Sequence, residues 1–228
     1  MLNITISVDP LTESNCYILS EGNHCVIIDP GESANLLRLL EEKGWTPELI
    51  LLTHEHCDHM AGLDAVRDRY PSARFLATAA CNEGIQDPRK NLSRIMHVYL
   101  HFRGKPGVQY EKFACRPADE IIADDALLEW QGHSLRFVHL PGHTPASEGI
   151  FLDEKVFFCG DYLIPGEEPV LRFPGGDEEA YETITKPFLQ QLQGETGDGS
   201  LSPSQIRGGD REPSPVSPCF VRICPGHK

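Results

Sequence analysis

The chain has 228 residues, enough for one α/β domain, and 40% of its residues are hydrophobic and 24% charged. This composition excludes collagen-like, fully disordered and coiled-coil chains. The 20 Lys and Arg residues stand against 34 Asp and Glu residues, so the formal net charge is −14. A charge of this sign disfavours nucleic acids and anionic membranes as partners.

The N-terminal segment has neither the basic flank nor the continuous apolar run of a signal peptide. No apolar run approaches the roughly 20 residues that span a bilayer. The 8 cysteines are spread along the chain without a CxxC pair, so we interpret them as reduced thiols. We therefore expect a cytoplasmic protein.

In the N-terminal half, short runs rich in β-branched residues alternate with amphipathic stretches. The helical spacing of four leucines over 36–40 predicts a helix, with Ser33 as its N-cap and Gly44 just beyond its end. A second helical pattern covers 60–70. Strands are expected at 4–8, 16–19, 25–29 and 49–53.

The C-terminal half contains clearer strands. The dipeptide Asp153-Glu154 predicts a tight turn between two of them, and 178–193 reads as a helix interrupted by Pro187. Between 78 and 118, Pro, Gly and polar residues mix with the apolar stretch 95–102, and no secondary structure is assigned there. Strands are expected at 127–130, 134–140, 149–152 and 155–159.

Residues 194–219 differ sharply in composition, since 14 of these 26 positions are Gly, Pro or Ser. Such a segment buries too little apolar area to offset its chain entropy. We predict a core over 1–193, a mobile and protease-sensitive insertion over 194–219, and a last core strand with a terminal metal-ligand loop over 220–228.

The most informative segment is THEHCDH at 53–59, between a buried strand and a helix. In an extended loop, residues two apart point the same way, so His54 and His56 can bind one ion while Asp58 and His59 reach a second. Ligands of open α/β sheets bind beyond the strand ends. Three further candidates each follow a predicted strand: His143, Asp161 and His227.

These segments resemble the metallo-β-lactamase superfamily of hydrolases, and within it the small glyoxalase-II-like (hydroxyacylglutathione hydrolase-like) branch. The resemblance also includes NCYIL at 15–19, IIDPG at 27–31, LPGHTPAS at 140–147, CGD at 159–161 and FPGGD at 173–177. It implies an αββα sandwich of two mixed β-sheets flanked by helices, with a metal site at one sheet edge.

The resemblance also implies two divalent metal ions. Zinc is the default from the ligand types, and iron or manganese suits the same mixed N/O donors. The first ion would be held by His54, His56 and His143, the second by Asp58, His59 and His227, and Asp161 would bridge both. In the β-lactam-cleaving branches that resemble this pattern most, a Cys commonly occupies the place of Asp161, which argues against antibiotic hydrolysis.

Two metal ions close together lower the pKa of a shared water, and the resulting metal-bound hydroxide is expected to attack a carbonyl. Asp58 is the candidate catalytic residue, because it can orient the nucleophile and carry its proton. Asp29 is a candidate hydrogen-bond partner of a ligand imidazole. A turn-capping role beside Pro30-Gly31 is an equal alternative for Asp29.

The resemblance favours hydrolysis of a small-molecule thioester of the S-lactoylglutathione type. One alternative is an iron-dependent persulfide dioxygenase that binds a single iron through His54, His143 and Asp161. A lactonase of the same superfamily is another. A protein that has lost catalysis is disfavoured, because every ligand of the pattern is present.

Other candidates are weaker. His97 and His101 would share a helix face without a third ligand, so they are interpreted as ordinary core or surface histidines. Tyr162 is read as a packed aromatic rather than a substrate contact, and Cys57 is assigned no role. His227 lies near the chain end, so we expect its ordering to cost more and the second ion to bind more weakly than the first.

Overall fold

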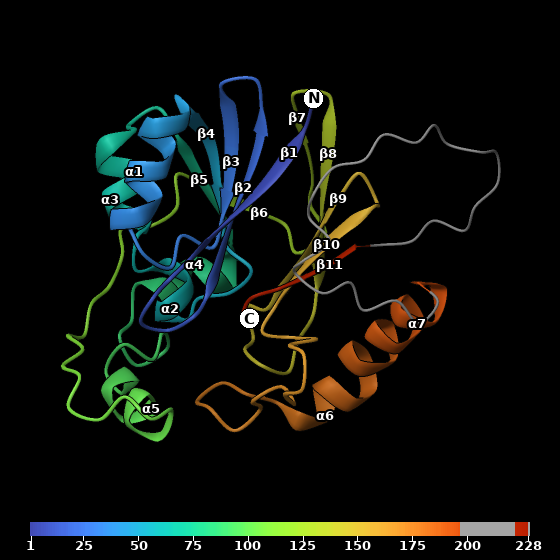
Figure 1. Cartoon of the computed structure of the whole chain (residues 1–228). Coiled ribbons are helices and arrows are strands. Elements are labelled where there is room, and N and C mark those ends of the chain that lie inside the picture. The colour runs from blue at the N-terminus through green and yellow to red at the C-terminus, as the bar shows by residue number, and fades with distance from the viewer. Residues whose placement is uncertain (197–221, 228) are drawn as a thin grey trace.

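The computed structural model describes residues 1–196 and 222–227. Two β-sheets pack face to face, with helices on the outer face of each sheet (Figure 1). The predicted αββα sandwich is therefore confirmed. Most of the predicted insertion, 197–219, lies outside the described residues, and its first three residues close the last helix.

The first sheet has the strand order β1-β2-β3-β4-β5-β6. Its first three strands pair antiparallel, and the pairs from β3 to β6 are parallel. Parallel strands place their carboxyl ends at one edge, which is where the motif loop leaves β4. The strands are β1 (Asn3–Val8), β2 (Asn15–Glu21), β3 (His24–Ile28), β4 (Thr46–Leu51), β5 (Arg74–Thr78) and β6 (Glu120–Ile122).

The second sheet has the order β11-β10-β9-β8-β7. The pairs from β7 to β10 are antiparallel, whereas β11, which follows them after a long gap in sequence, lies parallel to β10. The strands are β7 (Leu127–Trp130), β8 (His133–His139), β9 (Glu148–Leu152), β10 (Val156–Gly160) and β11 (Arg222–Pro225).

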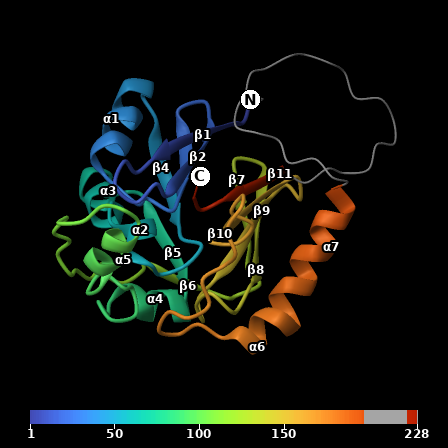
Figure 2. The ribbon, with the colours of Figure 1, turned by 60° about the horizontal axis from the view of Figure 1, so that its bottom comes forward.

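The helices form the two outer layers (Figures 1 and 2). α1 and α3 cover the first sheet, and α7 runs along the outer face of the second. The helices are α1 (Ala34–Lys43), α2 (Cys57–Met60), α3 (Leu63–Arg69), α4 (Ala79–Ile85), α5 (Met96–Phe102), α6 (Glu178–Ala180) and α7 (Lys186–Thr196), with a π-helical turn over Tyr181–Thr185.

Alternation along the strands builds separate cores on the two faces of the first sheet. Ile18 and Ile27 point to the helices, whereas Leu19 and Val26 point to the second sheet. Both faces are fully buried, which explains why these strands are apolar at successive positions. A third core packs α7 against the outer face of the second sheet.

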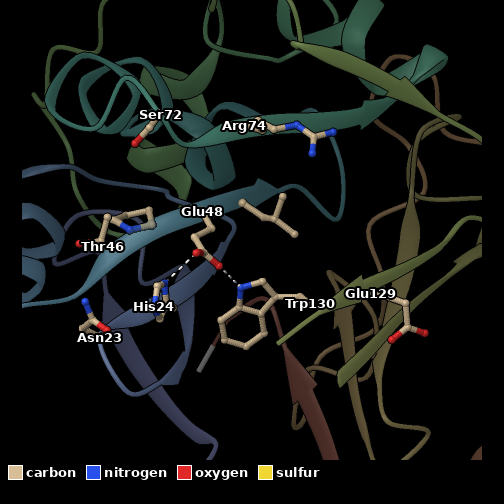
Figure 3. A pocket seen from close by; sticks show the side chains of 10 residues that line it. Asn23, His24, Thr46, Glu48, Ser72, Arg74, Glu129 and Trp130 are labelled. Carbon is tan, nitrogen blue, oxygen red and sulfur yellow. Dashed lines mark hydrogen bonds and ion pairs between the residues drawn. The ribbon is translucent and has the colours of Figure 1, made fainter. Parts of the chain in front are cut away.

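Glu48 joins the two sheets at the edge that lies away from the motif loop. Its carboxylate accepts hydrogen bonds from the Trp130 indole at 2.8 Å and pairs with His24 Nδ1 at 2.7 Å (Figure 3). Trp130 is in β7, whereas Glu48 and His24 are in the first sheet. An open pocket of about 470 Å³ adjoins this joint, and its lining contains none of the seven candidate ligands.

Three local predictions need correction. The helix expected over 60–70 begins only at Leu63, because a turn over 61–62 separates α3 from α2. Gly62 is required in this turn, since a Cβ there would lie 2.5 Å from the Glu32 carbonyl oxygen. Ser33 is the N-cap residue of α1 as predicted, but the carboxylate of Glu32 rather than the Ser33 side chain accepts hydrogen bonds from the N–H groups of Asn35 and Leu36. The helix expected over 178–193 continues through Pro187 without a break, since α6, the π-helical turn and α7 follow one another from Glu178 to Thr196. The regular α-helical hydrogen bonding is interrupted just before Pro187, whose ring has no N–H to donate.

Two strands escaped prediction, β5 and β6, and both flank the region that received no assignment. Elsewhere Gly44 ends α1 in the left-handed conformation as expected, at φ 66°. The turn at Asp153-Glu154 also forms, with both residues at positive φ. Within residues 1–196 and 222–227, no helix is long and apolar enough to cross a membrane.

Candidate metal centre

The seven candidate ligands come from four loops that meet at one edge of the sandwich. The THEHCDH loop links β4 to α2, and the other three loops follow β8, β10 and β11. β11 is parallel to β10, and β8 runs in the same direction because β8 and β10 are both antiparallel to β9, so the loops after these three strands leave the same edge of the second sheet. Segments separated by more than 160 residues are thereby brought together.

Four of the candidates form a first cluster. One potential ligand atom from each residue lies within 4.8 Å of the others. Three of these residues are buried imidazoles, with exposed fractions of at most 3%. The cluster consists of His54, His56, His143 and Asp161.

The other three candidates, Asp58, His59 and His227, form a second cluster with the same spacing limit. His59 is fully buried, and His227 Nε2 lies 3.4 Å from Asp58 Oδ2. Each cluster therefore combines imidazole nitrogen with carboxylate oxygen, the donor types that suit zinc, iron or manganese.

Asp161 lies between the two clusters and directs one oxygen to each. Its Oδ2 atom is 3.3 Å from His143 Nε2 in the first cluster. Its Oδ1 atom is 3.0 Å from His59 Nε2 and 3.4 Å from His227 Nε2 in the second. This is the arrangement that a bridging carboxylate requires, because each oxygen can serve a different ion.

Asp29 fixes the orientation of two imidazoles, that of His59 directly and that of His54 through Thr53. Its carboxylate accepts hydrogen bonds from His59 Nδ1 at 3.0 Å and from the Thr53 hydroxyl at 2.6 Å. Because the Thr53 hydroxyl donates to Asp29, it accepts from His54 Nδ1, 3.1 Å away. Both rings are thus held as the tautomer that leaves Nε2 free to face the clusters.

The ring of His143 is oriented in a different way. Its Nδ1 atom donates to the carbonyl oxygen of Val170 at 2.7 Å. Its backbone N–H donates to the Tyr162 hydroxyl, which in turn donates to the Leu140 carbonyl, both at 2.8 Å. Tyr162 is 2% exposed, so it acts as a buried brace for the His143 loop, as the packed-aromatic interpretation predicted.

The unpaired atoms of the centre fit divalent cations. Within the described residues, buried His54 Nε2 and His56 Nε2 have no hydrogen-bond partner. His56 Nδ1 and His143 Nε2 lie 3.0 Å apart and face the same space. Buried nitrogen atoms without a partner cost free energy, which a bound cation would offset.

The electrostatics of the centre point the same way. Burial lowers the pKa of His54 well below its usual range and the pKa of His56 to about 3, with the neighbouring imidazoles adding to the effect. His227 and His59 hold the pKa of Asp161 well below its usual range although burial opposes this. His54 and His56 are therefore neutral and Asp161 is ionised, the protonation states that metal binding requires. Asp161 and Asp29 raise the pKa of His59 although burial opposes this, so a metal ion at His59 would displace a proton.

The Pro-Gly-His segment that carries His227 is tied to both sheets. The N–H of Asn15 donates to the Gly226 carbonyl and the N–H of Gly226 donates to the Gly160 carbonyl, both at 2.6 Å. A Cβ at Gly226 would lie 2.7 Å from His59 Cε1, so only glycine lets this loop approach so closely. These contacts remove the reason for expecting His227 to fray, and weaker binding of the second ion stays a prediction.

Two features of the centre were missed from the sequence. Glu55, inside the motif, is 5% exposed and accepts a hydrogen bond from the Thr144 hydroxyl at 2.7 Å, which joins the motif loop to the His143 loop. The ring of Phe173 lies 6.0 Å from that of His56 and 6.0 Å from that of Tyr99, measured between centroids. The FPGGD segment was the available signal for Phe173.

The weaker candidates lie apart from the clusters. His97 and His101 are exposed on α5. Cys57 is fully buried against Met96 and Leu100, and burial raises the pKa of its thiol well above the usual range. The motif cysteine is therefore part of a small core.

We expect Asp29→Asn to weaken zinc binding by about 10- to 100-fold, the usual effect of losing a carboxylate behind a ligand imidazole. Asp29 has φ 54°, which asparagine tolerates, so the backbone should persist. Competition with a chromophoric chelator measures the affinity, and circular dichroism checks the fold. Zinc affinity equal to that of the unaltered protein would leave Asp29 with a turn-forming role alone.

Comparisons with known proteins agree with this geometry. The profile of a family described as the metallo-beta-lactamase superfamily matches residues 9–193. The hydroxyacylglutathione hydrolase of Klebsiella pneumoniae is 29% identical over 182 residues, which cover 79% of this chain and 59% of that protein. The probable metallo-hydrolase YqgX of Bacillus subtilis is 31% identical over 173 residues, 75% of this chain and 76% of that protein.

Among solved structures, that of the B3 metallo-beta-lactamase BLEG-1 has a TM-score of 0.65 at 30% identity, and the match covers 79% of this chain and 81% of that one. The chain spans about three fifths of the length of the hydroxyacylglutathione hydrolase. The His and Asp clusters are typical of the dinuclear site of this family.

Proposed function

Since the chain belongs to the metallo-β-lactamase superfamily and is a metal-dependent hydrolase of that family, we propose that its substrate is a thioester of the S-lactoylglutathione type. Similarity to the hydroxyacylglutathione hydrolase supports this substrate class. The main structural support is the position of Asp161 between the two clusters, because this position makes the centre suitable for two metal ions.

We propose zinc as the metal. One zinc ion would be held by the first cluster and another by the second, and Asp161 would contact both. Two divalent cations in these positions would polarise the thioester carbonyl and lower the pKa of a water molecule. The protein's own side chains must then position the acyl group, orient the water molecule and move its proton.

Asp58 is the proposed proton acceptor. Its side chain is buried, and its main-chain carbonyl is fixed by the Ser14 hydroxyl at 2.7 Å. The His227 hydrogen bond and the charge of His59 lower the pKa of Asp58 to about 2 although burial opposes this. An ionised carboxylate in this place can hold the attacking water, take its proton and deliver it to the departing thiolate.

Aromatic and basic side chains border the centre. Phe173 and Tyr99 provide an apolar wall for the acyl group. Burial raises the pKa of the Tyr99 phenol to about 12, and the nearby charge of Arg103, which pairs with Glu167 at 3.0 Å, opposes this. Lys105 pairs with Glu13 at 3.0 Å, and the charge of His227 acts on Glu13. Such groups suit an anionic thioester despite the net charge of −14.

The proposal is tested by thiol release. Zinc-loaded protein is incubated with S-lactoylglutathione, and free thiol is followed with a chromogenic disulfide. We expect turnover well above that of zinc in buffer, and loss of turnover when a chelator removes the metal. Absence of thiol release at every zinc loading would reject the thioester as substrate.

Parallel assays separate the alternatives. The likeness to the BLEG-1 structure makes a β-lactam the second candidate substrate, so a chromogenic cephalosporin and a lactone are measured at the same enzyme concentration. We expect the highest kcat/KM for the thioester. Oxygen uptake with glutathione persulfide by iron-loaded protein would instead favour the dioxygenase alternative, in which His54, His143 and Asp161 hold one iron.

A further inference from the structure

A third group of potential ligands lies outside the clusters described above. His139 at the end of β8 and Glu148 at the start of β9 are directly opposite each other in the antiparallel pair. Asp124, between β6 and β7, completes the group. One ring nitrogen of His139 and one oxygen of each carboxylate lie within 4.8 Å of one another.

Glu148 is the unusual member of this group. Its side chain is 2% exposed, and its Oε1 atom lies 3.2 Å from His139 Nδ1. Its Oε2 atom is buried and has no hydrogen-bond partner in the described part of the chain. A buried carboxylate oxygen without a partner costs free energy, so the site lacks a donor or a cation at this place.

The two carboxylates of the group repel each other, and His139 offsets this repulsion and the burial of Glu148 together only in part. Burial, together with the nearby Asp124, raises the pKa of Glu148 to about 7. The hydrogen bond that His139 Nδ1 donates to Glu148 raises the pKa of His139 although burial opposes this. Asp124 and His139 also line an open pocket of about 690 Å³, so the group can be reached from solvent.

We propose that Asp124, His139 and Glu148 form a mononuclear site for a divalent transition-metal cation, separate from the dinuclear centre. One imidazole nitrogen with two carboxylate oxygens favours zinc or manganese over calcium and magnesium, which prefer oxygen donors alone. Three protein ligands leave open positions for water.

This site is linked to the dinuclear centre through one hydrogen bond. The backbone N–H of Glu148 donates to the carbonyl oxygen of Thr53 at 2.7 Å. Thr53 immediately precedes His54 and accepts the hydrogen bond from its ring. A cation that fixes Glu148 would therefore steady the backbone next to the first cluster.

Metal content tests the proposal directly. Metal-free protein is dialysed against buffered zinc and the zinc per chain is measured by mass spectrometry, for the unaltered chain and for two variants. We expect Asp124→Asn and Glu148→Gln each to bind one zinc fewer per chain than the unaltered protein. Asp124 is exposed, so its replacement leaves the core intact even if Glu148→Gln folds poorly.

Asp125→Asn is the matched control, because Asp125 is exposed, lines the same pocket and carries the same charge. It should keep the zinc content of the unaltered protein. Because the comparison uses a difference of one ion, it does not depend on how many ions the dinuclear centre holds or on any substrate. Equal zinc content in the unaltered protein, Asp124→Asn and Asp125→Asn would overturn the proposal.

Discussion

Replacing His56 by alanine is expected to lower kcat/KM for thioester hydrolysis by about 10³-fold or more, because charge stabilisation by a bound metal contributes several kcal/mol. His56 Nδ1 lies 3.0 Å from His143 Nε2, and its ring packs edge-on against those of His54 and His143. Removal of the ring opens the first cluster on one side. The loss should persist at saturating zinc and saturating substrate.

His101→Ala is the control for this variant, because it removes an exposed imidazole from α5. Its kcat/KM should match that of the unaltered protein. Zinc content should fall in His56→Ala and stay unchanged in His101→Ala. A His56→Ala protein that keeps more than a tenth of the activity would show that the first cluster is not where the reaction is promoted.

Asp58→Asn is expected to lower kcat by about 10²- to 10⁴-fold, the range of a lost general base. Asparagine keeps the shape of the side chain, and the main-chain contact with Ser14 remains, so the loop should hold its place. The amide cannot take a proton from water. Steady-state kinetics and zinc content, measured on the same preparation, separate lost proton transfer from lost metal.

Asp68→Asn serves as the control, since Asp68 is an exposed aspartate of α3 whose side chain is 71% accessible. If Asp58→Asn retains its zinc and its kcat within a factor of about 3, the carboxylate moves no proton in the rate-limiting step.

Most strands could be predicted from the sequence because they are short, apolar and bounded by turn residues, whereas their arrangement as an αββα sandwich was implied by the family resemblance. β5 and β6 were not assigned, because β5 begins with the charged Arg74 and β6 has only 3 residues. The parallel pairing of these strands depends on partners far away in sequence, which local patterning does not encode.

The seven candidate ligands were found from a dense local motif and three strand-end residues, and the structure brings all of them together. The orientation of each imidazole was not predictable in the same way. It depends on tertiary hydrogen bonds such as the one from His143 Nδ1 to the Val170 carbonyl, 27 residues away. The Thr53 hydroxyl links Asp29 to His54 by two hydrogen bonds, and this link could also be recognised only in the folded chain.

The group of Asp124, His139 and Glu148 shows a further limit of sequence patterning. None of these residues belongs to a motif, and the pairing of His139 with Glu148 follows from the register of β8 and β9. Asp124 joins them from the connection between the two sheets. Only in the folded chain do potential ligand atoms of these three side chains lie within 4.8 Å of one another.

The dinuclear centre is tested most directly by anomalous scattering from a zinc-loaded crystal. We expect two zinc peaks at the meeting point of the loops, about 3.5–4 Å apart, one beside His54, His56 and His143 and one beside Asp58, His59 and His227, with Asp161 between them. A single peak held by His54, His143 and Asp161, or no peak at this edge of the sandwich, would contradict the dinuclear account.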